Sequence, residues 1–284
     1  MVVARRPPAQ VCTKRAVVYC HGKLDADVAF SDLAERAAED GTLVWLDLEA
    51  SSDVELGEIQ EEFGLHPLAI EDIRHPKQRP KVDNYESTLL VVLFDVRFDD
   101  AEQELQTHEV AIFVGKGFLI TMHAVPMPAL DAVHARWQKD PKMVEPSPLG
   151  FLLYRIASTL IDGYFPVTDE YDSQVEGIED RLFERFDRHE LKSLLRLRRE
   201  LTQLRRIVSP QRDVFTTLAR HDDDVLDSQT DAYFADIVDL VLRLIDTVDT
   251  TRDRLAAALD SFLTLQSNSL NETMKRLTAV GLPS

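Results

Sequence analysis

The sequence is poor in cysteine, and this excludes a fold held together by disulfides. Only Cys12 and Cys20 occur among its 284 residues, which is typical of a protein kept in a reducing compartment. Both lie close to His21 in the sequence, but a site for a soft metal needs about four converging ligands. Ordinary thiols in a strand or loop are therefore the favoured interpretation.

Long apolar runs are also missing. A helix needs about 20 consecutive apolar residues to cross a bilayer, whereas the best candidates here, residues 88–94 and 110–122, are short or interrupted by Lys116. The N-terminal stretch contains Arg5 and Arg6 but no apolar core of a signal peptide. We therefore expect a flexible polar tail at residues 1–15 and a chain that is soluble as written.

Basic residues are in the minority. The 32 lysines and arginines face 50 aspartates and glutamates, which gives a formal net charge of −18. This balance argues against a nucleic-acid partner, because phosphate binding needs a basic face; it suits cations, or solubility alone. The sequence also lacks a glycine-rich phosphate loop, a nucleophile elbow and a histidine pair at metal-ligand spacing, so we do not expect an enzyme.

Neither proline nor glycine occurs between Pro210 and Gly281, so nothing local interrupts a helix over residues 227–277. Apolar side chains recur there in alternating steps of three and four, the repeat that keeps one seam of a helix against a neighbour. Thr251 is the single polar member of this seam. Its apolar members are Phe234, Ile237, Val241, Leu244, Val248, Leu255, Ala258, Phe262 and Leu265. About fifty helical residues span roughly 75 Å, far more than a compact domain of this size needs.

A row of aspartates follows the same predicted helix, because Asp239, Asp246, Asp253 and Asp260 are spaced by seven. These side chains share the face opposite the apolar seam. One interpretation is a solvated acidic face. Another is that several identical helices stand side by side and form rings of carboxylates that attract hydrated cations. The spacing alone does not distinguish the two.

The first 145 residues alternate between short apolar runs and amphipathic stretches, which predicts strands and helices around one sheet. Strands are expected at residues 16–20, 43–48, 89–98, 109–114 and 117–122, with a polar excursion at 99–107. Helices are expected at residues 27–39, 53–63, 66–73 and 126–139. Ser51 or Ser52 is available to cap the second of these helices.

From residue 146 onward only helices are predicted. Residues 149–186, kinked at Pro166, and residues 190–208, continued by 214–219, form a hairpin that aligns acidic with basic side chains. We thus expect an α+β fold: an N-terminal α/β domain with a mixed sheet flanked by helices, then a helical hairpin and one very long C-terminal stalk helix. The expected divisions are a tail at residues 1–15, the α/β domain at 16–145, the hairpin at 146–226 and the stalk at 227–284.

Several stretches together resemble the CorA-type divalent-cation transporters, in order over nearly the whole chain. One is HPLAIEDI at residues 66–73, followed by QRPKV at 78–82 and the predicted strand at 89–94. Another begins as YFADI at 233–237 and continues through DTV at 246–248, RD at 252–253, SN at 267–268, NE at 271–272 and MK at 274–275. A weaker patch consists of LLY at 152–154 and LID at 160–162. Their joint occurrence, rather than any single motif, carries the resemblance.

The resemblance implies a homopentamer in which the long helix of each chain enters the membrane and lines a central pore. It also implies transport of Mg²⁺ or Co²⁺ and a location on the cytoplasmic face of the cell membrane. The family's apolar membrane helices and its Gly-Met-Asn signature at the pore mouth are missing from this sequence. We therefore expect that the chain alone moves no ion across a bilayer. Its ending at residues 280–284 favours a truncation just as the pore helix begins over a natural fragment.

Two metal sites and a pore surface are carried over from the family by position. Asp72 and Asp236 match a regulatory metal site between adjacent subunits. A second site beside it corresponds to Glu71, Asp162 and Asp239, although Leu240 stands where some relatives have a histidine, which weakens this site. The positions that match the cytoplasmic funnel of the pore are Asp260, Asn271, Met274 and Leu277.

The chemistry of Mg²⁺ is consistent with these assignments, because the ion prefers oxygen ligands and gives up its waters reluctantly. The resemblance then predicts a feedback gate in which bound ions join neighbouring subunits and carboxylate repulsion separates them when Mg²⁺ is scarce. Two alternatives stay open. One is a ZntB-type zinc transporter domain, against which the carboxylates argue because Zn²⁺ prefers imidazole and thiolate. The other is a soluble coiled-coil scaffold without an ion-gating role.

Overall fold

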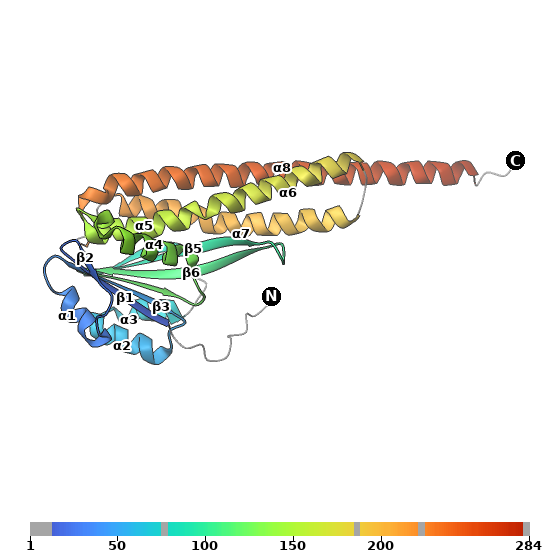
Figure 1. Ribbon diagram of the computed structural model, residues 1–284. Coiled ribbons are helices and arrows are strands. Elements are labelled where there is room, and N and C mark those ends of the chain that lie inside the picture. The colour runs from blue at the N-terminus through green and yellow to red at the C-terminus, as the bar shows by residue number, and fades with distance from the viewer. Residues whose placement is uncertain (1–12, 75–78, 185–187, 221–224, 281–284) are drawn as a thin grey trace.

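The computed structural model describes residues 13–74, 79–184, 188–220 and 225–280, in which one sheet carries helices on both faces (Figure 1). The strand order is β2-β1-β3-β7-β6-β5-β4, and all neighbours are antiparallel except β3 and β7, which are parallel. The predicted mixed sheet is thus confirmed. Its strands are β1 (Thr13–Cys20), β2 (Lys23–Asp25), β3 (Thr42–Glu49), β4 (Lys81–Tyr85), β5 (Thr88–Asp99), β6 (Glu104–Gly115) and β7 (Phe118–His123).

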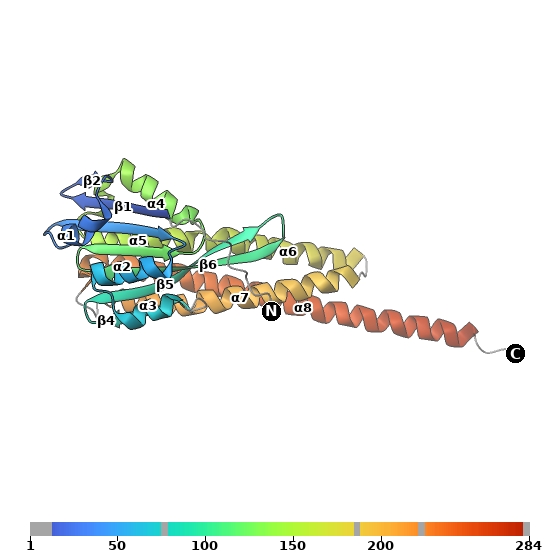
Figure 2. The ribbon, with the colours of Figure 1, turned by 90° about the horizontal axis from the view of Figure 1, so that it is seen from below.

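Two groups of helices sandwich this sheet (Figures 1 and 2). The first group covers one face and comprises α1 (Leu33–Ala37), α2 (Asp53–Phe63) and α3 (Pro67–Arg74), with a 3₁₀ turn at Phe30–Asp32 before α1. The second group lies on the other face and comprises α4 (Pro128–Lys139), α5 (Pro148–Asp162), α6 (Tyr164–Glu184), α7 (Arg188–Leu218) and α8 (Asp231–Val280), with 3₁₀ turns at Pro141–Val144 and Ser228–Thr230. Helix α8 packs against α7 and α6, so it forms the outermost layer.

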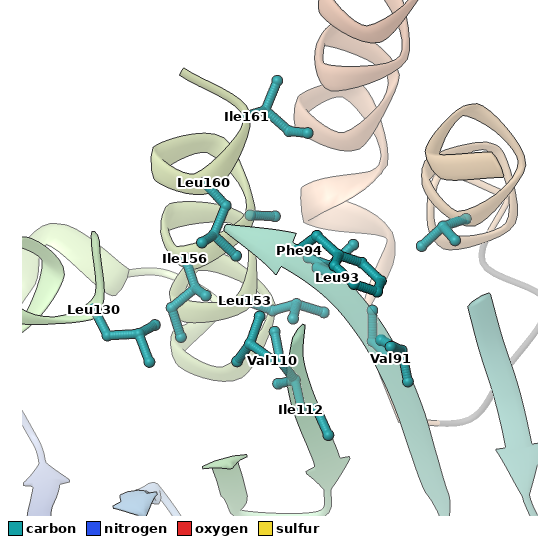
Figure 3. Packing of buried hydrophobic residues seen from close by; sticks show 14 of the residues in the cluster. Val91, Leu93, Phe94, Val110, Ile112, Leu130, Leu153, Ile156, Leu160 and Ile161 are labelled. Carbon is teal, nitrogen blue, oxygen red and sulfur yellow. The ribbon is translucent and has the colours of Figure 1, made fainter. Parts of the chain in front are cut away.

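The core lies where α5 meets the middle of the sheet (Figure 3). Leu153, Ile156 and Leu160 recur along α5 in steps of three and four and point toward Val110 and Ile112 of β6. All five side chains are buried. Central strands of this kind have apolar residues on both faces, which is why β5, β6 and β7 contain the continuous apolar runs of the sequence.

Helix boundaries follow local signals that the sequence displays. Ser52 caps α2, because its hydroxyl accepts from the Glu55 backbone N–H while the Glu55 carboxylate accepts from the Ser52 N–H. The predicted kinked helix at 149–186 is instead two helices, α5 and α6, separated at Gly163. Pro166 has no N–H to donate to the carbonyl of residue 162, so the helix is interrupted at that turn. Helix α7 continues through Pro210, as predicted.

Three predictions for the N-terminal domain were wrong in extent. The helix expected at 27–39 is reduced to the 3₁₀ turn and the five-residue α1. The polar excursion expected at 99–107 is mostly strand, because β5 and β6 pair up to Asp99 and Glu104 in a long hairpin. Strands β2 and β4 were missed, because both are short edge strands with few apolar residues. Of the two cysteines discussed above, Cys12 lies outside the described residues.

The apolar seam of α8 is buried from Phe234 to Phe262, and the hydroxyl of its polar member, Thr251, donates to the Thr247 carbonyl. Leu265, the last predicted seam residue, is exposed because α8 runs on past the ends of α6 and α7 (Figures 1 and 2). The predicted row of Asp239, Asp246, Asp253 and Asp260 is exposed on α8. The seam therefore packs against helices of the same chain.

Two arginines fix α8 to the hairpin at mid-length. Arg205 of α7 makes a two-pronged contact with Asp249, with Nε–Oδ1 and Nη2–Oδ2 distances of 2.5 and 3.1 Å. Arg254 of α8 reaches Asp172 at 2.6 Å and Glu179 at 2.7 Å, both on α6. The described ion pairs thus connect each hairpin helix to α8, whereas the sequence predicted attraction between the hairpin helices themselves.

A buried polar centre that the sequence analysis missed joins β3 and β7. The Asp47 carboxylate accepts hydrogen bonds from Thr121 Oγ1 (2.5 Å) and His123 Nε2 (3.1 Å). The other nitrogen of that ring, Nδ1, donates to the Val125 carbonyl oxygen at 2.7 Å. Because both nitrogens face acceptors, His123 is held as an imidazolium. Burial lowers the pKa of His123, but the hydrogen bond to Asp47 outweighs burial and raises it.

His134 of α4 completes this centre without a hydrogen bond. Its ring stacks flat on Trp45, with the ring centroids 3.5 Å apart, and its Nε2 lies 3.7 Å from Asp47 Oδ2. Neither ring nitrogen of His134 has a hydrogen-bond partner among the residues that the structure describes. Burial lowers the pKa of His134, so the ring is neutral. For Asp47, hydrogen bonds from the surrounding side chains outweigh burial and lower the carboxyl pKa.

These shifts predict that the centre stabilises the fold most just above pH 6.5, the ordinary histidine pKa. Below that pH, His134 binds a proton in the unfolded chain but not in the native protein, where its pKa is lower. The free energy of unfolding therefore falls. Above it, the contribution of His123 is lost as the pH rises through its raised pKa. The contribution of Asp47 is lost only as the pH falls below 3.8 through its lowered pKa.

Urea unfolding between pH 5 and 9 measures this dependence, and His134→Phe is the matched variant because phenylalanine can still stack on Trp45. We expect the wild-type slope to exceed the slope of the variant by up to about 1.4 kcal/mol per pH unit just below pH 6.5. Equal slopes for the two proteins would contradict the assignment of a neutral buried His134.

Candidate divalent-cation site

Helix α3 presents the first pair of candidate carboxylates. It begins at Pro67, where the missing N–H costs nothing, and the ring Nδ1 of His66 accepts from the Leu68 backbone N–H at 3.2 Å. Ala69 and Ile70 are buried toward the sheet. The helical period therefore turns Glu71 outward, where it is exposed, and leaves Asp72 partly buried at the side next to β4.

Asp72 lies against one face of β4. Lys81, Asp83 and Tyr85 alternate along that strand, so their side chains emerge on the same side. Lys81 Nζ lies 2.5 Å from Asp72 Oδ2 and 2.7 Å from Asp83 Oδ2. The Tyr85 hydroxyl donates to Asp72 Oδ2 at 3.5 Å, and the Tyr85 ring stacks on His66. Sequence analysis missed this cluster, although the alternation within residues 81–85 is a signal for it.

The charges of this cluster shift the pKa values of Lys81 and Tyr85. Burial lowers the pKa of the Lys81 ammonium, but hydrogen bonds to Asp72 and Asp83 outweigh burial and raise it. Burial, followed by the negative charges of the same two carboxylates, raises the pKa of the Tyr85 hydroxyl. Lys81 is therefore a fixed positive charge at neutral pH, directly beside Asp72.

The remaining candidate carboxylates lie on the helical layers of the opposite face. Asp236 and Asp239 are exposed near the start of α8, on either side of the buried Ile237. Asp162 is the last residue of α5 and is also exposed. Asp236 and Asp239 are one helical turn apart, so both are available on the outer surface of the helical layer.

One chain does not bring the predicted pair together. Helix α3 covers one face of the sheet, whereas α8 is the outermost helix on the other face (Figures 1 and 2). Within the described ranges, no group of three or more histidine, cysteine, aspartate or glutamate side chains is arranged to hold a metal ion. A site built from Asp72 and Asp236 would therefore need two copies of the chain.

The donor set nevertheless fits a hard divalent ion. Each predicted ligand supplies carboxylate oxygens, and the exposed side chains leave room for the water shell that Mg²⁺ retains. Asp72 and Asp236 could hold such an ion through its waters, with Glu71, Asp162 and Asp239 close to the same two surfaces.

The predicted pore surface lies on the distal part of α8. Asp260, Asn271 and Met274 are exposed there, while the side chain of Leu277 is outside the described residues. Leu263 and Leu270 add further exposed apolar side chains. None of the helices within the described residues has the length and apolar character needed to cross a membrane.

Comparison with known proteins adds the following findings. Residues 40–282 match the family described as CorA-like Mg²⁺ transporter protein. The chain is 31% identical over 222 residues to the cobalt/magnesium transport protein CorA of Thermotoga maritima, covering 78% of this chain but only 63% of that protein. It is 33% identical over 236 residues to the putative metal ion transporter YfjQ of Bacillus subtilis, covering 83% of this chain and 72% of that protein.

Solved structures share the fold. The complete structure of the CorA magnesium transporter from Methanocaldococcus jannaschii has a TM-score of 0.77 at 25% identity, with 93% of this chain and 81% of that chain covered. The soluble domain of the same transporter gives 0.74 at 22% identity and covers 89% and 97% of the two chains. The ZntB cytoplasmic domain from Vibrio parahaemolyticus gives 0.71 at 13% identity over 89% and 98%, a likeness of fold alone.

Proposed function

Since the chain belongs to the CorA-like Mg²⁺ transporter family, we propose that it is the ion-sensing, cytoplasmic part of a divalent-cation transport channel. Copies of the chain associate, as a homopentamer, so that α3 of one copy faces α8 of the next. Mg²⁺, or Co²⁺, binds between them through Asp72 and Asp236, with a second ion near Glu71, Asp162 and Asp239. The family is one of transporters, so we infer no enzymatic activity.

One observation carries this proposal: the exposed or half-exposed carboxylates lie on opposite outer surfaces of a single chain. Such surfaces meet only when a second copy docks. Facing carboxylates repel one another, and a divalent cation between them removes the repulsion. Abundant Mg²⁺ would therefore hold neighbouring α8 helices in one arrangement, and its loss would release them.

The distal part of α8 has a separate role in the proposal. Asp260, Asn271, Met274 and Leu277 would line the funnel through which ions pass, since the end of α8 lies beyond α6 and α7 and Asp260 is exposed just before that end. Rings of exposed aspartates there would raise the local concentration of hydrated cations.

The test measures the association of this chain in Mg²⁺ and in EDTA. Native mass spectrometry reports the oligomer, and limited proteolysis reports the protection of α8. We expect Mg²⁺ to promote the oligomer and protect α8 from cleavage. Asp72→Asn and Asp236→Asn should each raise the Mg²⁺ concentration at the midpoint about 10- to 100-fold, the usual cost of losing a group that holds a metal through its waters.

Asp100→Asn is the matched control, because it removes one exposed carboxylate from the β5–β6 turn, away from α3 and α8. Its midpoint should equal that of the wild type. If Mg²⁺ changes neither the oligomer mass nor the protease resistance of the chain, a coiled-coil scaffold without an ion-gating role is favoured. A response to Zn²⁺ at much lower concentrations than to Mg²⁺ would favour a ZntB-type function instead.

A further inference from the structure

The ammonium group of Lys81 occupies the surface of Asp72 that a bound cation would use. Its Nζ donates a charge-assisted hydrogen bond to Asp72 Oδ2, and the two groups form an ion pair. The backbone of Lys81 is held in β4, where this residue stands opposite Val92 of β5. A positive charge is thereby built into the candidate site from within the same chain.

The Lys81 ammonium also contacts a second carboxylate, that of Asp83. Asp83 follows two residues later on the same face of β4, and its Oδ2 lies 2.7 Å from Lys81 Nζ. The three groups together carry one net negative charge, from two carboxylates and one ammonium. If Lys81 leaves Asp72, it keeps one carboxylate partner, and Asp72 Oδ2, which also accepts from the Tyr85 hydroxyl, can then contact another cation.

We propose that Lys81 is a tethered competitor of the divalent cation at Asp72 and that it sets the affinity of the site. The inference rests on the proposed function, because it assigns a role to Lys81 in the ion binding described there. Binding of Mg²⁺ near Asp72 moves the ammonium toward Asp83. The ion must displace a resident positive charge, so the site responds only at higher Mg²⁺ concentrations than its carboxylates alone would set.

A purely structural role for Lys81 makes the opposite prediction. If the ammonium only held Asp72 in the right orientation, its removal would leave the carboxylate less ordered and would weaken Mg²⁺ binding. Competition instead predicts tighter binding, because two like charges a few ångströms apart repel one another even in water. The sign of the change in affinity therefore distinguishes the two roles.

The experiment compares Lys81→Met with the wild type in the Mg²⁺ titration of protease protection and oligomer mass. We expect the midpoint for Lys81→Met to fall about three- to tenfold, the size of effect that one nearby charge produces at a partly exposed site. Lys81→Arg, which keeps the charge, should stay much closer to the wild type. Lys116→Met removes an equal charge from the β6–β7 turn and should leave the midpoint unchanged. An unchanged or higher midpoint for Lys81→Met would overturn the proposal.

Asp83→Asn supplies an independent variant with the opposite sign. Without its second partner, the ammonium stays with Asp72, and a nearby negative charge is also lost, so the midpoint should rise about two- to threefold. The part of this increase that comes from Lys81 should disappear in the Lys81→Met background, so the increase there should be smaller. An undiminished increase in that background would overturn the transfer of Lys81 to Asp83, and so would no increase in the single variant, which can be measured even if Lys81→Met does not fold.

Failure of this inference is distinguishable from failure of the proposed function. If the wild type responds to Mg²⁺ and Asp72→Asn raises the midpoint of the response about 10- to 100-fold, the site exists whatever Lys81 does. If the wild type shows no response to Mg²⁺, the proposed function itself fails, and with it the competition at Asp72.

Discussion

Leu244→Ala is expected to lower the free energy of unfolding by about 3 to 5 kcal/mol. The Leu244 side chain is fully buried in the seam between α8 and the hairpin helices, and truncation leaves a cavity as well as removing apolar contacts. Leu242, two residues earlier on the same helix, is 40% exposed. Leu242→Ala deletes the same atoms from the other side of α8 and should cost below about 1 kcal/mol.

Urea unfolding of the two variants, at fixed protein and Mg²⁺ concentration, measures the difference. The slope of the free energy against urea should stay constant, so that a shift of the midpoint reports stability alone. Equal destabilisation by the two substitutions would mean that Leu242 is covered in solution by another copy of the chain. Since association is concentration-dependent, repeating the measurement at tenfold lower protein concentration separates that case from an error in the packing of α8.

Asp47→Ala is the second substitution with a large expected effect, about 3 to 5 kcal/mol at pH 7. It removes the only carboxylate that contacts the His123 imidazolium in the described structure, so the buried charge keeps the Val125 carbonyl but has no counter-charge. The cost should become smaller as the pH rises from 7 to 9, because an increasing share of His123 then loses its proton in the wild type as well.

Asp213→Ala is the matched control for Asp47→Ala. Asp213 also forms an ion pair, with Arg212 at 2.9 Å, but its side chain is 73% exposed. Pairs of that kind contribute little, so the control should change stability by less than about 1 kcal/mol. Thermal or urea unfolding at pH 7 and pH 9 provides the comparison, and a cost for Asp47→Ala that does not depend on pH would contradict an imidazolium at His123.

Periodicity predicted those parts of the fold that depend on neighbours in the sequence. The seam from Phe234 to Phe262 and the cap at Ser52 both follow from spacing or local backbone chemistry, and the structure confirms them. Leu265 fits the same spacing, yet it is exposed, because the length of α6 and α7 decides where the seam ends. No pattern within residues 227–277 contains that information.

Contacts between distant segments could not be predicted in the same way. The ion pair of Asp72 with Lys81 depends on how α3 lies against β4, and no strand was predicted at residues 81–85. The contact of Asp47 with His123 needs the parallel pairing of β3 with β7, in which Asp47 stands opposite Thr121. A charged residue within the apolar run at 43–48 was the one available signal. The assignment of Asp72, Asp236 and the other site residues rests on family resemblance and remains a prediction.

The two arginine contacts at Asp249 and Arg254 divide α8 into unequal arms. From this anchorage to Asp236 there are about 15 residues, and to Val280 about 28, which is roughly 23 Å and 42 Å of helix. The apolar seam also holds the shorter arm against the hairpin helices, whereas the longer arm loses this support after Phe262. If α8 tilted as a stiff rod about the arginines, a sideways movement of 1 Å at Asp236 would become about 2 Å at Val280, in the opposite direction.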